Sequence, residues 1–152
     1  MNEIELIQES KRTLVGIRRK VNVQDLAGFF AEALPKTASW LGEKGIAPVS
    51  APMAMWCEMN METGIADTHA GFFVAGDIEV DGEFSLGHTL GGDVLKLVHQ
   101  GGYETMGDSW MRVYGHAEGL GRAPGAGWEI YIDDPDETPL ESLRTEIYLP
   151  VE

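Results

Sequence analysis

Residues 127–152, GWEIYIDDPDETPLESLRTEIYLPVE, decide the fold. The segments WEIYI (128–132) and LRTEIYLPV (143–151) are rich in aromatic and β-branched residues, which is typical of β-strands. The segment between them, DPDETPLES, is polar and contains prolines, which indicates a turn-rich loop. The end of the chain therefore predicts two strands joined by a long loop.

The first of these strands contains an acidic residue, Glu129, between Trp128 and Ile130. Alternate side chains of a strand share one face of the sheet. Glu129 is therefore expected on the same face as Tyr131, opposite to Trp128, Ile130 and Ile132. Two interpretations remain open: either this face is solvated, or the acid and the tyrosine line a pocket.

Upstream, the pattern of the second half begins with a strand at 92–100 and a helix at 101–121. The helix is indicated by apolar residues that recur every three or four positions. These residues are Tyr103, Met106, Trp110, Val113 and Ala117. With the two strands that follow, residues 92–151 predict a βαββ module.

The first half, residues 12–76, repeats this pattern after a polar lead-in at 1–11. A strand at 12–21 is followed by a helix at 22–45 and by strands at 51–60 and 68–76. Pro35 is expected to kink or split the helix, and Gly45 to end it.

Residues 81–90 predict a strand that links the two halves. We therefore expect one α+β domain, 1–152, built from duplicated βαββ modules with pseudo-twofold symmetry, antiparallel sheets and a central groove.

Pairing the two halves places Trp56 where the second half has Tyr131, and Ala54 where it has Glu129. If both strands flank the groove, then Trp56, Tyr131 and Glu129 converge on it. Aromatic rings and one carboxylate suit a flat cationic ligand. Ordinary core packing explains the aromatic residues equally well, and both Trp110 and Tyr103 fit either core or pocket.

Two further residues have simpler interpretations. Glu146 alternates with Arg144 and Tyr148 and is expected in an exposed cross-strand ion pair. His99 beside the Gly-Gly turn is expected to serve local packing and turn geometry.

The composition narrows the function. With 25 acidic against 11 basic residues, the net charge of −14 repels phosphate backbones, so we expect no direct nucleic-acid binding. Apolar runs fall short of the roughly 20 residues that span a membrane, and the N-terminus does not resemble a signal peptide, so we expect a cytoplasmic protein. One cysteine and four scattered histidines give no metal spacing, and we expect neither metal nor cofactor.

Two segments resemble the GyrI-like effector-binding domains. VHQGGYETMGDSWMRVYGHAEGLG (98–121) is similar to their H-x-G-x-Y strand–turn–helix segment, although Gly102 stands where the family usually has proline. WEIYIDDPDETPLESLRTEIYLPV (128–151) is similar to their C-terminal signature of a Glu-x-Tyr strand, an Asp-Pro turn and an Arg-Thr-Glu strand.

This resemblance implies a duplicated βαββ fold with a central small-molecule pocket, in which Glu129 and Tyr131 match the ligand-facing residues. Such domains occur in bacterial AraC-type and MerR-type regulators that sense bulky cationic drugs. Here we expect a standalone member without a DNA-binding domain. It would bind a hydrophobic, aromatic cation through Trp56, Glu129, Tyr131, Trp110 and Tyr103, and so sequester or sense drugs.

Two alternatives remain open. The first is a hydrolase of the same fold that opens strained, cyclopropane-type electrophiles, with Glu129 and Tyr131 as catalytic residues. The second is an acidic interaction protein that binds a basic partner such as DNA gyrase.

Overall fold

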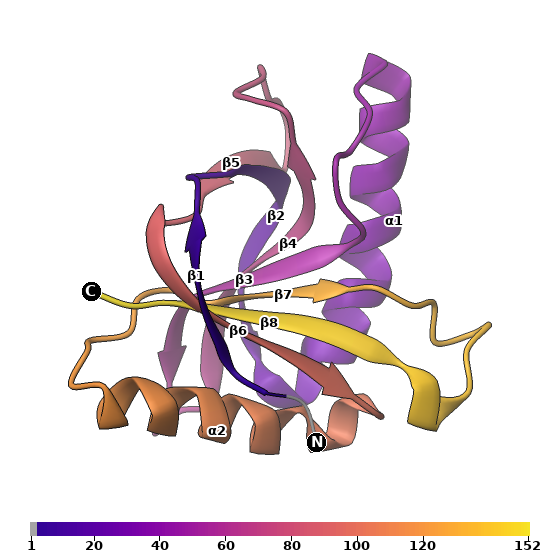
Figure 1. Cartoon of the computed structure of the whole chain (residues 1–152). Helices are drawn as coiled ribbons and strands as arrows, with labels where there is room; N and C mark the ends of the chain where they lie inside the picture. The colour runs from indigo at the N-terminus through magenta and orange to yellow at the C-terminus, as the bar shows by residue number, and fades with distance from the viewer. Residues whose placement is uncertain (1–2) are drawn as a thin grey trace. The chain divides into compact units, whose positions relative to one another are not determined.

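The computed structural model describes residues 3–152, which form two units (Figure 1). The N-terminal unit is residues 11–89, and the C-terminal unit combines residues 90–152 with the first strand of the chain. Within the described residues, each unit holds a four-stranded antiparallel sheet and one long helix. The predicted α+β class is confirmed.

The N-terminal unit has the sheet order β3-β4-β2-β5. Its elements are β2 (Thr13–Asn22), the short 3-10 helix η1 (Val23–Asp25), α1 (Leu26–Lys44), β3 (Met53–Asn60), β4 (Ile65–Val74) and β5 (Phe84–His88). The C-terminal unit has the order β7-β8-β6-β1. Its elements are β1 (Glu5–Glu9), β6 (Gly92–Gln100), η2 (Tyr103–Thr105), α2 (Met106–Gly119), β7 (Trp128–Tyr131), η3 (Leu140–Ser142) and β8 (Arg144–Pro150).

The two units repeat one topology, so the predicted duplication of a βαββ module is confirmed. Each module gains a fourth strand beside its first one: β5 pairs with β2, and β1 pairs with β6. The expectation of a polar lead-in over residues 1–11 is wrong for Glu5–Glu9. Their backbone groups pair with β6 in register from Glu5 opposite Lys96 to Glu9 opposite Gly92, so the pairing of main-chain groups outweighs the polar side chains.

The helix of the N-terminal unit is not split at Pro35. α1 runs unbroken from Leu26 to Lys44 and ends at Gly45, which adopts the left-handed conformation (φ 69°). A proline removes the hydrogen bond to the carbonyl four residues earlier, here Ala31. Ala31 and Pro35 both lie on the exposed side of α1, where water can satisfy that carbonyl. The helix therefore tolerates the proline because the lost bond is on its solvent face.

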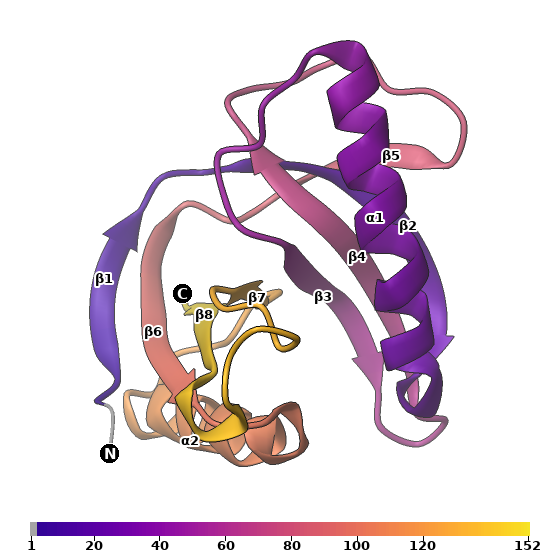
Figure 2. The same ribbon diagram turned by 90° about the vertical axis from the view of Figure 1, so that its right-hand side faces the viewer.

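Each helix covers one face of its own sheet. α1 lies along β2 and β4 (Figure 2), and α2 lies against β6 and β8. The core under α2 is a single cluster of buried residues: Leu95, Leu97, Met106, Val113, Ala117, Ile147, Leu149 and Val151. Its β-strand members all have odd numbers, so odd positions of β6 and β8 face α2 and even positions face away. Among the described residues, neither helix combines the length and the apolar character that crossing a membrane requires.

Gly16 and Gly71 face each other across the β2–β4 pair. A Cβ atom at either position would lie 1.9 Å from a backbone carbonyl oxygen of the neighbouring strand. A change of rotamer cannot relieve such an overlap. We therefore expect Gly16→Ala and Gly71→Ala each to lower the free energy of unfolding by at least about 2 kcal/mol in urea titrations.

Gly42→Ala in α1 is the matched control, because a Cβ there meets no atom within 4 Å. It should leave stability unchanged or raise it by about 0.5–1 kcal/mol, as alanine favours the helix. A Gly16→Ala protein as stable as wild type would contradict the close approach of the two strands.

Candidate functional site

The site is built around Glu129, a buried acidic residue on β7. Glu129 is 4% exposed. It stands opposite Ile147 in the β7–β8 pair, and Ile147 belongs to the core under α2. Glu129 therefore faces the helix, while its neighbour Trp128 lies on the other face, stacked on Tyr148 at 5.3 Å between ring centroids. The interpretation of a solvated acid is wrong.

The carboxylate accepts hydrogen bonds from the helix and from its own strand. The indole Nε1–H of Trp110, on α2, donates to one oxygen of Glu129 at 2.6 Å. The hydroxyl of Tyr131, two residues along the strand, donates to the other oxygen at 2.8 Å. Hydrogen bonds to a charged acceptor are stronger than neutral ones and offset part of the cost of burial. Both donors are neutral, so they orient the carboxylate without cancelling its charge.

The ring of Trp110 needs a glycine beneath it. A Cβ atom at Gly127 would lie 2.7 Å from Cη2 of Trp110 and 2.9 Å from the carbonyl oxygen of Tyr148. Sequence reasoning did not identify Gly127, because its role depends on a helix side chain 17 positions away. The glycine lets the indole approach the strand closely enough to reach Glu129.

Tyr103 completes the aromatic surroundings. It lies on η2, is 42% exposed, and meets the ring of Tyr131 edge-on at 5.8 Å between centroids. Burial, followed by the negative charge of Glu129, raises the pKa of both tyrosines above the ordinary value. Both phenols therefore remain protonated near neutral pH. Of the predicted site residues, the structure thus brings Glu129, Tyr131, Trp110 and Tyr103 together in one unit.

Trp56, the remaining predicted site residue, belongs to the N-terminal unit. It lies on β3 opposite Thr68 and meets the ring of Phe30 edge-on at 6.3 Å. Phe30 is four residues into α1, as Trp110 is four residues into α2. Phe30, Ala54 and Trp56 therefore take the places that Trp110, Glu129 and Tyr131 take in the other unit. That Trp56 shares a ligand with Glu129 stays a prediction.

A second acid–tyrosine pair lies on the opposite face of the same sheet. The hydroxyl of Tyr148 donates to Glu146 at 2.9 Å, and the Nζ atom of Lys96 on β6 lies 3.6 Å from the same carboxylate. The predicted cross-strand ion pair of Glu146 is present, although both side chains are only about a quarter exposed, at 25% and 27%. Arg144 pairs instead with Asp133, at 3.0 Å.

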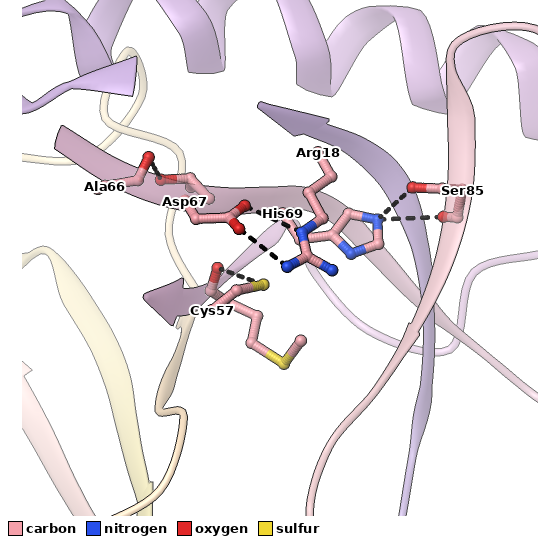
Figure 3. Close-up of polar contacts among 8 residues, drawn as sticks. Arg18, Cys57, Ala66, Asp67, His69 and Ser85 are labelled. Carbon is pink, nitrogen blue, oxygen red and sulfur yellow. Dashed lines mark hydrogen bonds and ion pairs between the residues drawn. The ribbon is translucent and has the colours of Figure 1, made fainter. Parts of the chain in front are cut away.

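Another polar cluster, on β2, β3 and β4, is shown in Figure 3. Arg18 donates two hydrogen bonds of 2.9 Å to Asp67. The Nε2 atom of His69 lies 3.1 Å from the carbonyl oxygen of Ser85, and burial lowers the pKa of this histidine. Burial also raises the pKa of the Cys57 thiol, which opposes formation of a thiolate nucleophile. This cluster therefore has the character of a structural network.

Two surface hollows lie in the N-terminal unit, with volumes of about 430 and 250 Å³. The larger is lined by Arg19, Lys20, Val21, Asn22, Asp25, Gly28, Phe29 and Glu32. The smaller is lined by Lys20, Glu58, Asn60, Thr63, Ile65 and Asp67. Charged side chains line both hollows, among them the ion-paired Arg19 and Glu32 in the larger one. Ligand sites, in contrast, are typically lined mostly by apolar and aromatic side chains.

Comparison with solved structures shows the same fold in proteins of low sequence identity. The EcmrR chain in the structure titled "Cryo-EM structure of EcmrR-DNA complex in EcmrR-RPo" matches with a TM-score of 0.85 at 15% identity. The match covers 99% of this chain, which spans 57% of that EcmrR chain. The isolated EcmrR C-terminal domain matches with a TM-score of 0.82 at 14% identity, over 100% of this chain and 98% of that domain.

A further match is SAV2435 in its structure bound to tetraphenylphosphonium, with a TM-score of 0.67 at 19% identity over 99% of this chain and 94% of that one. Among curated proteins, no sequence matches the chain significantly. The family model of the GyrI-like small molecule binding domain matches residues 2–152. The chain therefore belongs to the GyrI-like small-molecule-binding family.

Proposed function

We propose that this domain binds a hydrophobic, aromatic cation at the carboxylate of Glu129. The observation that carries the proposal is the burial of Glu129, which is 4% exposed and whose carboxylate accepts hydrogen bonds from the neutral side chains of Trp110 and Tyr131. An acid that served only the fold would be replaceable by an apolar residue, as Ala54 shows at the equivalent place of the other unit. A fixed negative charge in an apolar environment favours a cationic ligand instead.

The electrostatic contribution of such a charge is large. Two opposite charges about 4 Å apart attract by roughly 4 kcal/mol at the effective dielectric constant of a protein surface. In bulk water the same pair gains only about 1 kcal/mol. Because Trp110 and Tyr131 already orient the carboxylate, binding a cation does not have to order it.

The aromatic rings add a surface that suits a delocalised cation. Trp110, Tyr131 and the half-exposed Tyr103 surround the acid, and cations are attracted to the faces of such rings. The chain itself holds a cation in a similar arrangement, because Lys96 lies 3.6 Å from Glu146 and 5.5 Å from the ring of Tyr148. The tetraphenylphosphonium complex of SAV2435 is consistent with this ligand class.

A hydrolase is the second candidate, and the Glu129–Tyr131 pair favours it. A carboxylate able to accept a proton from water lies 2.8 Å from a phenol that remains able to donate one. Opening a strained ring by water needs both roles. The hydrolase predicts consumption of an electrophilic ligand that Glu129→Gln abolishes, whereas a binding protein returns its ligand unchanged.

Two ions of matched shape and opposite charge test the proposed ligand class. We expect tetraphenylphosphonium to quench the tryptophan fluorescence saturably, and tetraphenylborate not to bind. Glu129→Gln should weaken tetraphenylphosphonium binding by about tenfold to a hundredfold, because it removes the charge but keeps the side-chain shape. Isothermal titration calorimetry gives the dissociation constants independently of the fluorescence.

Glu146→Gln is the matched control, since it changes the net charge equally but acts on the acid that pairs with Lys96. Its affinity for tetraphenylphosphonium should stay within about twofold of wild type. Equal losses in the two variants would show that the acidic surface as a whole attracts the cation. If the protein instead binds a basic partner such as gyrase, the complex should weaken as the salt concentration rises, and Glu129→Gln should leave its affinity unchanged.

The pKa of Tyr131 provides a prediction that needs no ligand. Burial, the charge of Glu129 and the hydrogen bond to it hold this pKa well above the ordinary tyrosine value. Glu129→Gln removes the charge that opposes the tyrosinate, so the pKa should fall. Carbon-13 resonances of labelled tyrosine Cζ, followed against pH, measure it, with Tyr131→Phe to assign the signal. An unchanged pKa in Glu129→Gln would contradict the contact between the two groups.

A further inference from the structure

The two aromatic residues that flank the Glu129–Tyr131 pair are held by one buried histidine. His99 lies near the end of β6 and is 6% exposed. Its Nε2 atom lies 2.9 Å from the carbonyl oxygen of Gly102, the residue before Tyr103. Its Nδ1 atom lies 2.6 Å from the hydroxyl oxygen of Ser109, the residue before Trp110. One imidazole therefore bridges the backbone carbonyl before Tyr103 and the side chain of the residue before Trp110.

The hydrogen-bond pattern determines the roles of the two ring nitrogens. A carbonyl oxygen only accepts, so Nε2 must carry the proton that it shares with Gly102. In the neutral ring Nδ1 is then an acceptor, and Ser109 donates to it. The hydroxyl of Thr105 lies 3.0 Å from the same carbonyl and 3.2 Å from Nε2, which closes the network.

The turn before Tyr103 has a further anchor. Gly101 adopts a φ of +123°, a conformation that other residues rarely take. Its N–H donates to the carbonyl oxygen of Leu143 at 2.8 Å. The turn is thus fixed both to Leu143, the residue before β8, and, through His99, to α2. Local packing, as expected from the sequence, describes only part of the role of His99.

We propose that His99 is the positioning residue of the cation site: it sets the distance of Tyr103 and of Trp110 from the Glu129–Tyr131 pair. This inference rests on the proposed function. If it holds, each ring nitrogen controls one aromatic side chain. Nε2 controls Tyr103 through Gly102, and Nδ1 controls Trp110 through Ser109.

Two substitutions separate the two bonds. The side-chain oxygen of His99→Asn lies near the place of Nδ1 and can accept from Ser109, but the donor to Gly102 is lost. The side-chain amide of His99→Gln reaches the place of Nε2 and can donate to Gly102, but the acceptor for Ser109 is lost. His116→Gln, at the exposed end of α2, is the control.

With tetraphenylphosphonium as the probe, we expect each His99 variant to raise the dissociation constant by about tenfold. Double-mutant cycles identify the route. In a protein that already carries Tyr103→Leu, His99→Asn should raise the dissociation constant by less than about twofold. In a protein that already carries Trp110→Phe, His99→Gln should likewise raise it by less than about twofold. Two outcomes would show that His99 only stabilises the fold. In the first, the losses of affinity caused by the two substitutions add in both cycles. In the second, the His99 variants bind within about twofold of wild type but have lowered melting temperatures.

A ligand-free measurement keeps this test separate from that of the proposed function. The indole N–H of Trp110, bonded to a carboxylate at 2.6 Å, should resonate well downfield of those of the other tryptophans. His99→Gln should move this proton resonance upfield, and His116→Gln should not. If wild type fails to bind the probe, the proposed ligand class fails, while the movement of this resonance still supports positioning. A resonance unchanged in His99→Gln overturns the inference in either case.

Discussion

The burial of one charged group, Glu129, explains most of the local architecture around it. A carboxylate removed from water costs several kcal/mol unless donors replace the lost solvent. Trp110 supplies one donor from the helix and Tyr131 another from the strand. The indole of Trp110 can reach the carboxylate of Glu129 only if position 127 lacks a side chain and the helix stays close to β7. His99 then fixes the start of that helix. A core of apolar residues alone would require none of these arrangements.

The duplication of the fold provides an internal comparison. In the N-terminal unit the same layout of strand and helix carries Phe30, Ala54 and Trp56. The rings of Phe30 and Trp56 meet edge-on, and Ala54 is fully buried. The C-terminal unit replaces them with Trp110, Glu129 and Tyr131. The carboxylate of Glu129 is thus a difference between the two modules, and the proposed function rests on it.

The sequence was informative where periodicity determines the answer. Alternation along β7 correctly placed Glu129 with Tyr131 and opposite Trp128. The tethering of Trp110 to Glu129 could not be read in the same way, because it joins a helix to a strand through tertiary packing. The unbroken path of α1 through Pro35 and the pairing of Glu5–Glu9 with β6 also depend on tertiary surroundings. Local patterns thus predicted the elements and their faces, whereas contacts between elements required the structure.

The two acid–tyrosine pairs of the C-terminal unit place the same residue types in different surroundings. Glu146 receives a lysine from the neighbouring strand, and that ion pair remains partly in contact with water. Glu129 is buried more deeply and receives a tryptophan and a tyrosine, which are neutral. For stability alone, the opposite assignment would be favoured, since the more deeply buried charge gains more from a cation. This contrast between the two acids is the physical basis of the proposal that Glu129 attracts a cation from solution.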